Sequence, residues 1–175
     1  GVSTASQPSD FTAHVSDFNV ARSVAAGLRV SGPHCNQDFA CSSGYLATHH
    51  ASGALKADDE CRLMLVSGVS LLLKPDSALR LYMMGVLSPS GRMRPFDTTA
   101  DGMVWGEACA ALVLAAEAVS AESSCHARLL GSATNTNNAL SPAGFVAADK
   151  IAQAAEAGLT AAQIAPGQLA VVHPH

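Results

Sequence analysis

The stretch GPHCNQDFACSSGYLATHHA, residues 32–51, decides how the rest of the chain is interpreted. An extended run opened by Gly32 and Pro33 leads to Cys41, after which small residues favour a helix from Ser42 to about Lys56. Cys41 is therefore expected where a strand turns into a helix. The N–H groups and the dipole of a helix N-terminus stabilise a thiolate and can hold an oxyanion. The sequence predicts a nucleophile; the alternative is an inert, buried cysteine, since free cysteines are usually buried.

The composition predicts one compact domain with a buried core. Of 175 residues, 49% are hydrophobic and 14% are charged, more apolar than a disordered chain. A net charge of -4 argues against nucleic acid and anionic membrane as main partners. No run reaches the roughly 20 apolar residues of a membrane span, and no signal peptide is recognisable. Five cysteines without C-x-x-C spacing indicate neither a metal site nor a disulfide framework and favour a cytoplasmic, reducing compartment, with an organelle as the alternative.

The order of predicted elements indicates an α/β fold of stacked layers. Apolar residues at helical spacing and turn signals predict helices, and continuous apolar runs predict strands that are buried on both faces. Helices are expected over residues 21–29, 42–56, 75–84, from about 118, and 143–157 with Gly158 as its stop. Strands are expected from residue 34 to the nucleophile and over residues 61–73, 108–116, 128–133 and 169–172.

Some other polar residues are predicted to have no chemical role. His49 and His50 lie two turns beyond Cys41 along the helix, too far to act on its sulfur. The run Asp58 to Glu60 is more typical of a solvated loop than of a metal site. A group of apolar residues could be ordinary core or the wall of an acyl-binding site: Met83, Met84, Leu87 and Phe96.

Several motifs, in order, resemble the β-ketoacyl synthases, in particular the ketosynthase domains of polyketide synthases and type I fatty acid synthases. DFACSS at residues 38–43 resembles the nucleophile motif Asp-x-Ala-Cys-Ser-Ser of that family. LSPSGRMRPFD at 87–97 and ADGMVWGEA at 100–108 resemble two further motifs. SGVS at 67–70, LGSATN at 130–135 and VVHPH at 171–175 match more loosely. The resemblance covers roughly residues 21–175.

The resemblance implies a thiolase-like layered αβαβα architecture, here incomplete. Residues 1–175 would form part of one ketosynthase domain, with 1–20 poorly matched and the second half of the domain after residue 175. The chain starts with Gly rather than Met and stops inside a motif, which is expected of a fragment. The fragment alone is expected to be incomplete as an enzyme.

The resemblance also implies a reaction and the residues that perform it. An acyl group moves to Cys41, a malonyl-type extender on an acyl carrier protein loses carbon dioxide, and the resulting enolate condenses with the acyl group. His175 stands where the family has its first catalytic histidine and would stabilise the enolate. Met103 and Phe96 would contact the acyl chain. No metal and no cofactor is expected, because the phosphopantetheine of the carrier protein holds the substrates.

The implied partners are the acyl carrier protein and, through the strand before Cys41, a second copy of the chain. Polar residues at 34–37 stand where the family has apolar ones, which weakens that homodimer contact. Two other functions stay open. One is another cysteine acyltransferase of the same fold, such as a thiolase or a chain-initiating condensing enzyme. The other is a non-catalytic partner subunit or decayed fragment.

Overall fold

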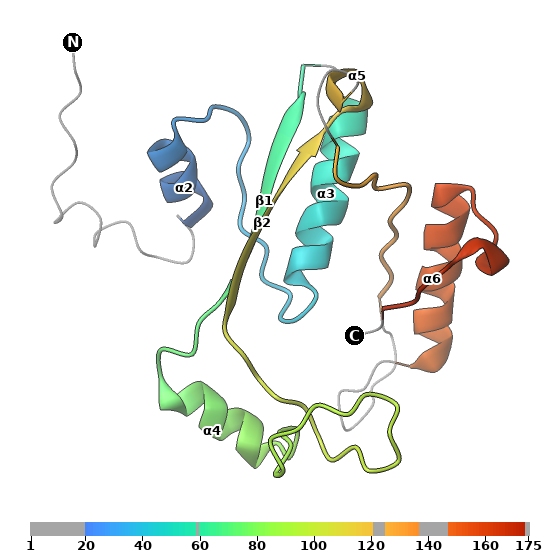
Figure 1. Cartoon of the computed structure of the whole chain (residues 1–175). Coiled ribbons are helices and arrows are strands. Elements are labelled where there is room, and N and C mark those ends of the chain that lie inside the picture. Colours follow the sequence, from blue (N-terminus) through green and yellow to red (C-terminus); the bar gives the residue numbers. More distant parts are fainter. Residues whose placement is uncertain (1–19, 59, 121–124, 137–146, 174–175) are drawn as a thin grey trace, which may run out of the picture. The chain divides into compact units, whose positions relative to one another are not determined.

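The computed structural model describes residues 20–58, 60–120, 125–136 and 147–173 (Figure 1). The chain forms two compact units, residues 1–46 and 47–175. Each unit is described by itself. Residues 1–19, almost all of the segment expected to match the family poorly, lie outside the described residues.

The first unit contains helix α2, Val20–Leu28, and the approach to the nucleophile. The predicted helix at 21–29 is confirmed, and Arg29 ends it in the left-handed conformation with φ of 56°. The strand predicted from residue 34 is wrong: residues 30–38 form no strand. Their polar side chains bond locally instead, since Asn36 Oδ1 accepts from the Ala21 N–H at 2.9 Å and Gln37 Nε2 donates to Cys35 Sγ at 3.4 Å.

Helix α3, Ser43–Ala57, follows the Cys41 turn and confirms the predicted helix. Its start lies in the first unit and its remainder in the second. Ala51 in α3, with 3% of its surface exposed, and Val66, with 8%, are the buried apolar residues of the described part. Small residues such as Ala51 allow a helix to be packed closely. In the same helix, His49 is half-buried and His50 is exposed.

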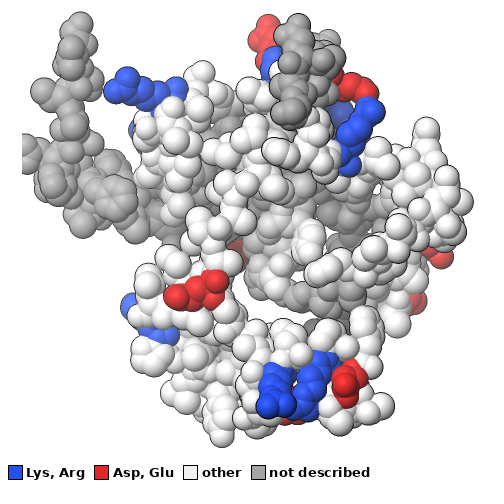
Figure 2. Space-filling view, in the orientation of Figure 1, with Lys and Arg blue, Asp and Glu red and all other residues white. Residues whose placement is uncertain are grey.

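Two strands form the sheet of the second unit. β1, Leu63–Ser70, pairs antiparallel with β2, Ala108–Ala115, from Leu63 opposite Ala115 to Ser70 opposite Ala108. Both strands were predicted, but their expected burial on both faces is wrong. Only Val66 is buried in the pair, because no further strand extends this sheet within the described residues. On the face shown in Figure 2, charged atoms lie in a few separate groups among uncharged ones.

Helix α4, Pro75–Met83, confirms the third predicted helix. Proline suits a first helical turn because its missing N–H would have no partner there, and Asp76 adds a negative charge at the positive end of the helix dipole. The chain returns from α4 to β2 through residues 84–107, which form no regular element. Glu107 Oε1 accepts from the Leu72 N–H at 2.6 Å and so joins the end of this connection to the short segment between β1 and α4.

The predicted elements after β2 are only partly observed. Helix α5, Glu117–Ser120, begins at about the expected place. Residues 128–133 and 169–172 are not strands, because the structure gives neither segment a partner strand in the described part. A single turn of 3-10 helix, η2, occupies Pro166–Gln168.

Helix α6, Ala148–Ala162, is shifted from the predicted range 143–157. Residues 143–146 lie outside the described part, and Ala147 is extended. Gly158 is not a stop, because it lies inside α6, which ends at Gln163 with φ of 57°. A Cβ on Gly131 would meet the Gly158 carbonyl oxygen at 2.8 Å and the Ala162 nitrogen at 2.5 Å. Gly131 therefore allows the segment at 131 to approach the backbone of α6.

The described helices include none that is both long and apolar enough to cross a membrane.

Candidate active site

Cys41 lies in a tight turn immediately before α3. The preceding residue, Ala40, has φ of 50°, a left-handed conformation that costs a non-glycine residue about 1 kcal/mol or more. Two serine hydroxyls hold the turn: Ser42 Oγ donates to the Phe39 carbonyl at 2.8 Å, and Ser43 Oγ donates to the Ala40 carbonyl at 2.7 Å. Ser43 Oγ also accepts from the Phe39 N–H at 2.8 Å. The side chains that follow Cys41 thus stabilise the strained backbone before it.

This turn presents the Cys41 thiol at the surface rather than in a core. Cys41 is an exposed free thiol, so it is not the buried cysteine of the alternative, and its reactivity stays a prediction. The Ser42 and Ser43 N–H groups donate to the Phe39 and Ala40 carbonyls at 3.2 Å each. Those two amides already donate hydrogen bonds within the turn. The Cys41 amide therefore remains as the candidate oxyanion donor.

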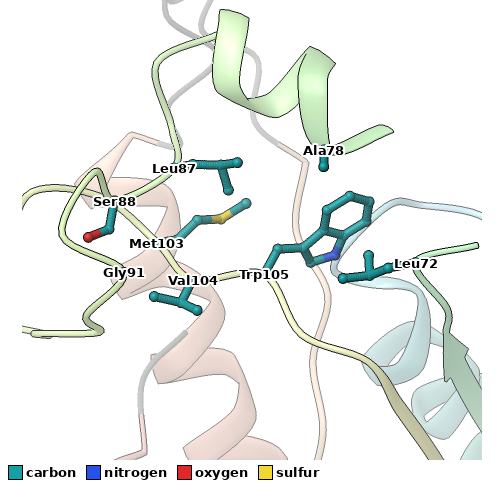
Figure 3. Close-up of a pocket in the computed structure, with 8 residues that line it drawn as sticks. All are labelled: Leu72, Ala78, Leu87, Ser88, Gly91, Met103, Val104 and Trp105. Carbon is teal, nitrogen blue, oxygen red and sulfur yellow. The ribbon is translucent and has the colours of Figure 1, made fainter. Parts of the chain in front are cut away.

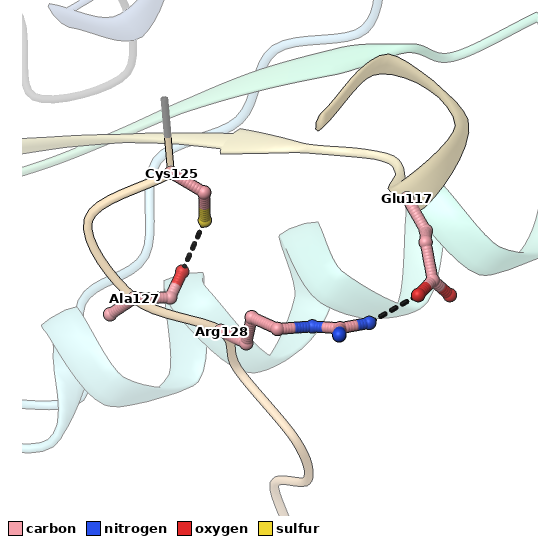
Figure 4. A network of polar contacts seen from close by, with 4 residues as sticks. All are labelled: Glu117, Cys125, Ala127 and Arg128. Atoms are coloured by element: carbon pink, nitrogen blue, oxygen red, sulfur yellow. Dashed lines mark hydrogen bonds and ion pairs between the residues drawn. The ribbon is translucent and has the colours of Figure 1, made fainter. Parts of the chain in front are cut away.

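All five cysteines are free thiols. Cys125 shows what another exposed thiol does: its Sγ donates to the Ala127 carbonyl at 2.8 Å, beside an ion pair between Arg128 and Glu117 (Figure 4). Unlike Cys41, Cys125 is not followed by a helix, since residues 125–136 form none. It therefore serves as the comparison for Cys41.

The sequence predicted a catalytic role for His175 and none for His49. His175 lies outside the described residues, so its predicted role stays a prediction. His49 was expected to be structural, and its Nδ1 lies 2.8 Å from Ser132 Oγ in a partly buried contact that joins α3 to the segment 125–136. Groups of three or more histidine, cysteine or acidic residues suited to a metal ion are absent from the residues that the structure describes.

A small apolar pocket of about 180 Å³ lies between α4 and the connection that leads to β2 (Figure 3). The segments at Leu87 and Met103 pair as a short parallel bridge. The Ser88 N–H donates to the Met103 carbonyl at 2.8 Å, and the Met103 N–H donates to the Val86 carbonyl at 2.9 Å. The pocket is lined by Leu72, Ala78, Leu87, Ser88, Gly91, Met103, Val104 and Trp105.

The structure separates the predicted acyl-contacting residues. Met103 lines the pocket, as does Leu87 from the apolar group. Phe96 does not line it and is 90% exposed, with φ of 62°. Met83 and Met84 are also exposed and lie outside the lining.

Sequence reasoning missed Trp105. Residues 103 and 105 alternate along an extended segment, so their side chains fall on the same face. The indole of Trp105, the only tryptophan of the chain, extends toward Leu72 and Ala78 in Figure 3. Because Met103 was already a candidate, its spacing of two residues from Trp105 could have identified Trp105 from the sequence.

A polar network holds the loop beside the pocket. Asp101 Oδ1 accepts from Ser88 Oγ at 2.5 Å, and Asp101 Oδ2 accepts from the Ser90 N–H at 3.3 Å. The hydrogen bond from Ser88 is the main cause that lowers the pKa of the Asp101 carboxyl. Arg94 joins the network through Nη2, which donates to Ser90 Oγ at 3.3 Å.

A second carboxylate in the same loop bonds elsewhere. Asp97 Oδ1 accepts from the Thr99 hydroxyl and from the Thr99 N–H, both at 2.7 Å. These bonds lower the pKa of the Asp97 carboxyl, with the side-chain bond first. Neither Asp97 nor Thr99 lines the pocket.

Comparison with known proteins identifies the family and the fold of the chain. Residues 3–120 match the family described as "Beta-ketoacyl synthase, N-terminal domain". The chain is 37% identical over 154 residues to the mycocerosic acid synthase-like polyketide synthase of Mycolicibacterium smegmatis, an alignment that covers 87% of this chain and 7% of the relative. The chain thus spans a small part of that protein.

Two solved structures have a similar fold. The ketosynthase domain OzmH KS7 for oxazolomycin from Streptomyces albus JA3453 has a TM-score of 0.73 and 29% identity, covering 88% of this chain and 28% of its own. A type II polyketide synthase ketosynthase, solved with its acyl-carrier protein and a bound hexaketide, has a TM-score of 0.76 and 24% identity, covering 92% of this chain and 41% of its own. The predicted α/β class, as part of a thiolase-like fold, is confirmed by these neighbours.

Proposed function

This chain belongs to the β-ketoacyl synthase family, and from that membership we propose that it forms the nucleophile-bearing part of a ketosynthase in polyketide biosynthesis. The observation that carries the proposal is the exposed Cys41 thiol on a strained turn at the start of α3. The polyketide pathway is favoured over fatty acid synthesis by the relative named above.

In the first half-reaction, the Cys41 thiolate attacks the carbonyl of an acyl thioester. The tetrahedral oxyanion accepts a hydrogen bond from the Cys41 N–H, and the phosphopantetheine thiol leaves as the acyl-cysteine forms. Met103 is proposed to contact the acyl chain. Phe96 is the second proposed contact; its high exposure leaves its ring accessible to a chain at the surface.

In the second half-reaction, a malonyl-type extender loses carbon dioxide, and the electrons of the broken C–C bond form an enolate. His175 is proposed to stabilise the enolate oxygen. The enolate carbon attacks the acyl-Cys41 carbonyl, the sulfur leaves as thiolate, and a β-ketoacyl thioester is released. Because these steps involve no oxidation or reduction and the nucleophile is a thiolate of the chain itself, we propose no metal and no cofactor bound to this chain.

An acyl carrier protein is the proposed partner. A structural neighbour was solved in complex with its acyl-carrier protein, which supports the same kind of partner here. A homodimer is a second proposed assembly. Its support is weaker, because residues 34–37 form no strand that could pair with the same strand of a second copy. The proposed location is the cytoplasm, which is supported by five unpaired thiols.

Acyl loading of Cys41 tests the proposal. The protein is incubated with acyl-phosphopantetheinyl carrier protein or with the matching coenzyme A thioester, and peptide mass spectrometry locates the acyl group. Loading of Cys41 from the carrier, absent in Cys41→Ala and retained in Cys125→Ala, is expected. Preferential loading from coenzyme A would favour a thiolase-type enzyme, and no loading from either donor would favour a non-catalytic subunit.

A further inference from the structure

The peptide group between Ala40 and Cys41 carries the amide that is proposed to hold the oxyanion. Its carbonyl belongs to Ala40 and its N–H to Cys41. The Ala40 carbonyl accepts two hydrogen bonds from Ser43, one from Oγ at 2.7 Å and one from the N–H at 3.2 Å. A single residue at the start of α3 thus holds this peptide group by its oxygen.

These bonds determine which way the Cys41 N–H points. In a trans peptide, the C=O and the N–H point in opposite directions. Because the Ala40 carbonyl points toward Ser43, the Cys41 N–H points away from Ser43. The hydroxyl that binds the carbonyl therefore does not compete with an oxyanion for the N–H.

The left-handed conformation of Ala40 depends on the same contacts. Its φ of 50° is unfavourable for a residue with a Cβ. The Ala40 N–H donates to Asp38 Oδ1 at 3.4 Å, and the Ala40 carbonyl is bonded by Ser43 Oγ. Ala40 is thus held on both sides. Loss of the Ser43 hydroxyl would allow Ala40 to relax toward negative φ, and the Cys41 N–H would rotate with it.

The Ser43 hydroxyl also joins these bonds into a chain. Ser43 Oγ accepts from the Phe39 N–H at 2.8 Å and donates to the Ala40 carbonyl. A hydroxyl that accepts a hydrogen bond donates more strongly, and a carbonyl that accepts one strengthens the N–H of its own peptide group as a donor. The chain therefore ends in a strengthened Cys41 N–H. All of these residues belong to the unit of residues 1–46.

We propose that Ser43 is a positioning residue: its hydroxyl orients and polarises the Cys41 amide and so speeds acyl transfer to the Cys41 thiol. The inference rests on the proposed function and deepens it by naming the side chain that prepares the oxyanion donor. Ser43 acts through hydrogen bonds alone and keeps its proton throughout. The bonds that form and break are those of the first half-reaction described above.

Ser42 supplies a matched control. Its Oγ donates to the Phe39 carbonyl at 2.8 Å, a bond of similar length in the same turn. That carbonyl belongs to the preceding peptide group, whose N–H is that of Ala40. Removing the Ser42 hydroxyl therefore loosens the turn without removing a bond to the peptide group that carries the Cys41 N–H.

The experiment compares two reactions of the Cys41 thiol in the full protein. Acylation by a butyryl acyl carrier thioester is followed by mass spectrometry in single turnovers at several thioester concentrations, and alkylation by iodoacetamide is followed in parallel. Acylation passes through an oxyanion. Alkylation displaces iodide from a methylene carbon and forms no oxyanion, so its rate reports only the exposure and the thiolate content of Cys41.

Ser43→Ala should slow acylation selectively. Removing an oxyanion donor outright costs roughly 10² to 10³ in rate, and this variant weakens the donor without removing it, so the maximal rate should fall about tenfold. The thioester concentration at half-maximal rate and the alkylation rate should change by less than about twofold, because the oxyanion exists only after the sulfur attacks. Ser42→Ala should lose at most about threefold in acylation.

A pair of variants of equal shape tests the hydroxyl itself if Ser43→Ala does not fold. Ser43→Thr keeps a hydroxyl and should keep most of the acylation rate. Ser43→Val replaces that hydroxyl by a methyl group and should behave as expected for Ser43→Ala. Circular dichroism spectra of all variants report whether the fold is retained.

An equal fall of acylation and alkylation in folded Ser43→Ala would overturn the inference, because the hydroxyl would then act on the thiol. A wild-type acylation rate in Ser43→Val, an equal loss in Ser42→Ala, or failure of both Ser43→Ala and Ser43→Val to fold would overturn it as well. In these cases acylation of the wild type leaves the proposed function standing. If wild-type Cys41 is alkylated but accepts no acyl group from any thioester, the proposed function fails, and the inference fails with it.

Discussion

At the scale of single residues, the turn before α3 combines backbone strain with an exposed thiol. Ala40 is held in the left-handed region by two serine hydroxyls on the far side of Cys41. Strain of this kind persists only where surrounding bonds impose it, and such sites are often functional. The following two predictions concern this turn.

Cys41 should be the thiol that is alkylated first by limiting iodoacetamide. Its exposure makes it accessible, and the N-terminus of α3 stabilises the negative charge of the attacking sulfur. Peptide mapping by mass spectrometry after short reaction times measures the order of labelling. Cys125, which is also exposed but bonds the Ala127 carbonyl, is the comparison, and earlier labelling of Cys61 or Cys109 would contradict the site.

Ala40→Gly should leave the free energy of unfolding unchanged within about 0.5 kcal/mol. Relief of the left-handed strain is worth about 1 kcal/mol and offsets the entropy that glycine adds to the unfolded chain. Ala47→Gly, inside α3, is the matched control and should destabilise by about 1 kcal/mol. Urea denaturation compares the two. A loss in Ala40→Gly as large as in Ala47→Gly would show that the turn is not strained.

At the scale of elements, close backbone contacts and loop carboxylates connect the regular segments. Gly131 lies against α6, and His49 bonds Ser132 one residue later. The segment 125–136 is thus fixed between two helices without being a strand. Its stability depends on these contacts rather than on a sheet.

Gly131→Ala should destabilise the protein by roughly 2 to 3 kcal/mol. The new methyl group would lie 2.5–2.9 Å from backbone atoms of α6, which can move only if the helix shifts. Gly53→Ala in α3, where nothing lies within 4 Å of an added Cβ, is the control and should stabilise by about 0.5–1 kcal/mol. Thermal unfolding followed by circular dichroism measures both, and a stabilised Gly131→Ala would exclude the close contact.

The loop from Ser88 to Asp101 should loosen in acid. Hydrogen bonds from Thr99 lower the pKa of the Asp97 carboxyl, and those from Ser88 and Ser90 lower the pKa of the Asp101 carboxyl, so the fold favours the ionised form of both. Their contribution to stability is therefore fully present above the unfolded value and is lost as the pH falls through the folded values. Hydrogen exchange at the Ser90 and Thr99 amides between about pH 5 and 2 should show this loss. In Asp101→Asn, the protection of the Ser90 amide from exchange, relative to its intrinsic rate, should no longer change with pH. The protection of the Thr99 amide should still fall in acid.

Residue types within a few positions predicted most of the helices. Strands were predicted less well, because a strand also depends on a partner strand distant in the sequence. The helix after Cys41 and the one opened by Pro75 follow from residue type within a few positions. Residues 128–133 and 169–172 are apolar enough for strands, but a strand exists only where another strand bonds it. At the site, Cys41 was evident from its motif. The Asp101 network was not, because it depends on which loops meet.

At the scale of the whole molecule, the chain covers a limited part of the enzymes that it resembles, 28% of the oxazolomycin ketosynthase domain. β1 and β2 bury only Val66 between them. Two paired strands alone are at best marginally stable in water. The described strand pair is therefore expected to need further packing against an apolar surface to be stable.

A polypeptide of these 175 residues should acylate Cys41 without forming a β-ketoacyl product. The resemblance to β-ketoacyl synthases further implies a second catalytic histidine and a second oxyanion donor, neither of which it assigns to a position in these 175 residues. Donors of this kind account for about 3 to 4 kcal/mol each. Their absence implies a rate loss on the order of 10⁴ to 10⁶. Acyl and malonyl carrier thioesters are supplied to this polypeptide and to one extended through the remaining motifs. Equal product formation by both would disprove the mechanism.

The register of β1 and β2 implies an order of folding. Ser70 pairs with Ala108, so the strands enclose residues 71–107, and every residue that lines the pocket falls inside this loop. Closing the loop costs conformational entropy before the contacts inside it can form. The nucleus of folding is therefore expected in the strand pair, and the pocket should form late. Mutations at Val66 should slow folding, whereas mutations at Ser88 should mainly speed unfolding.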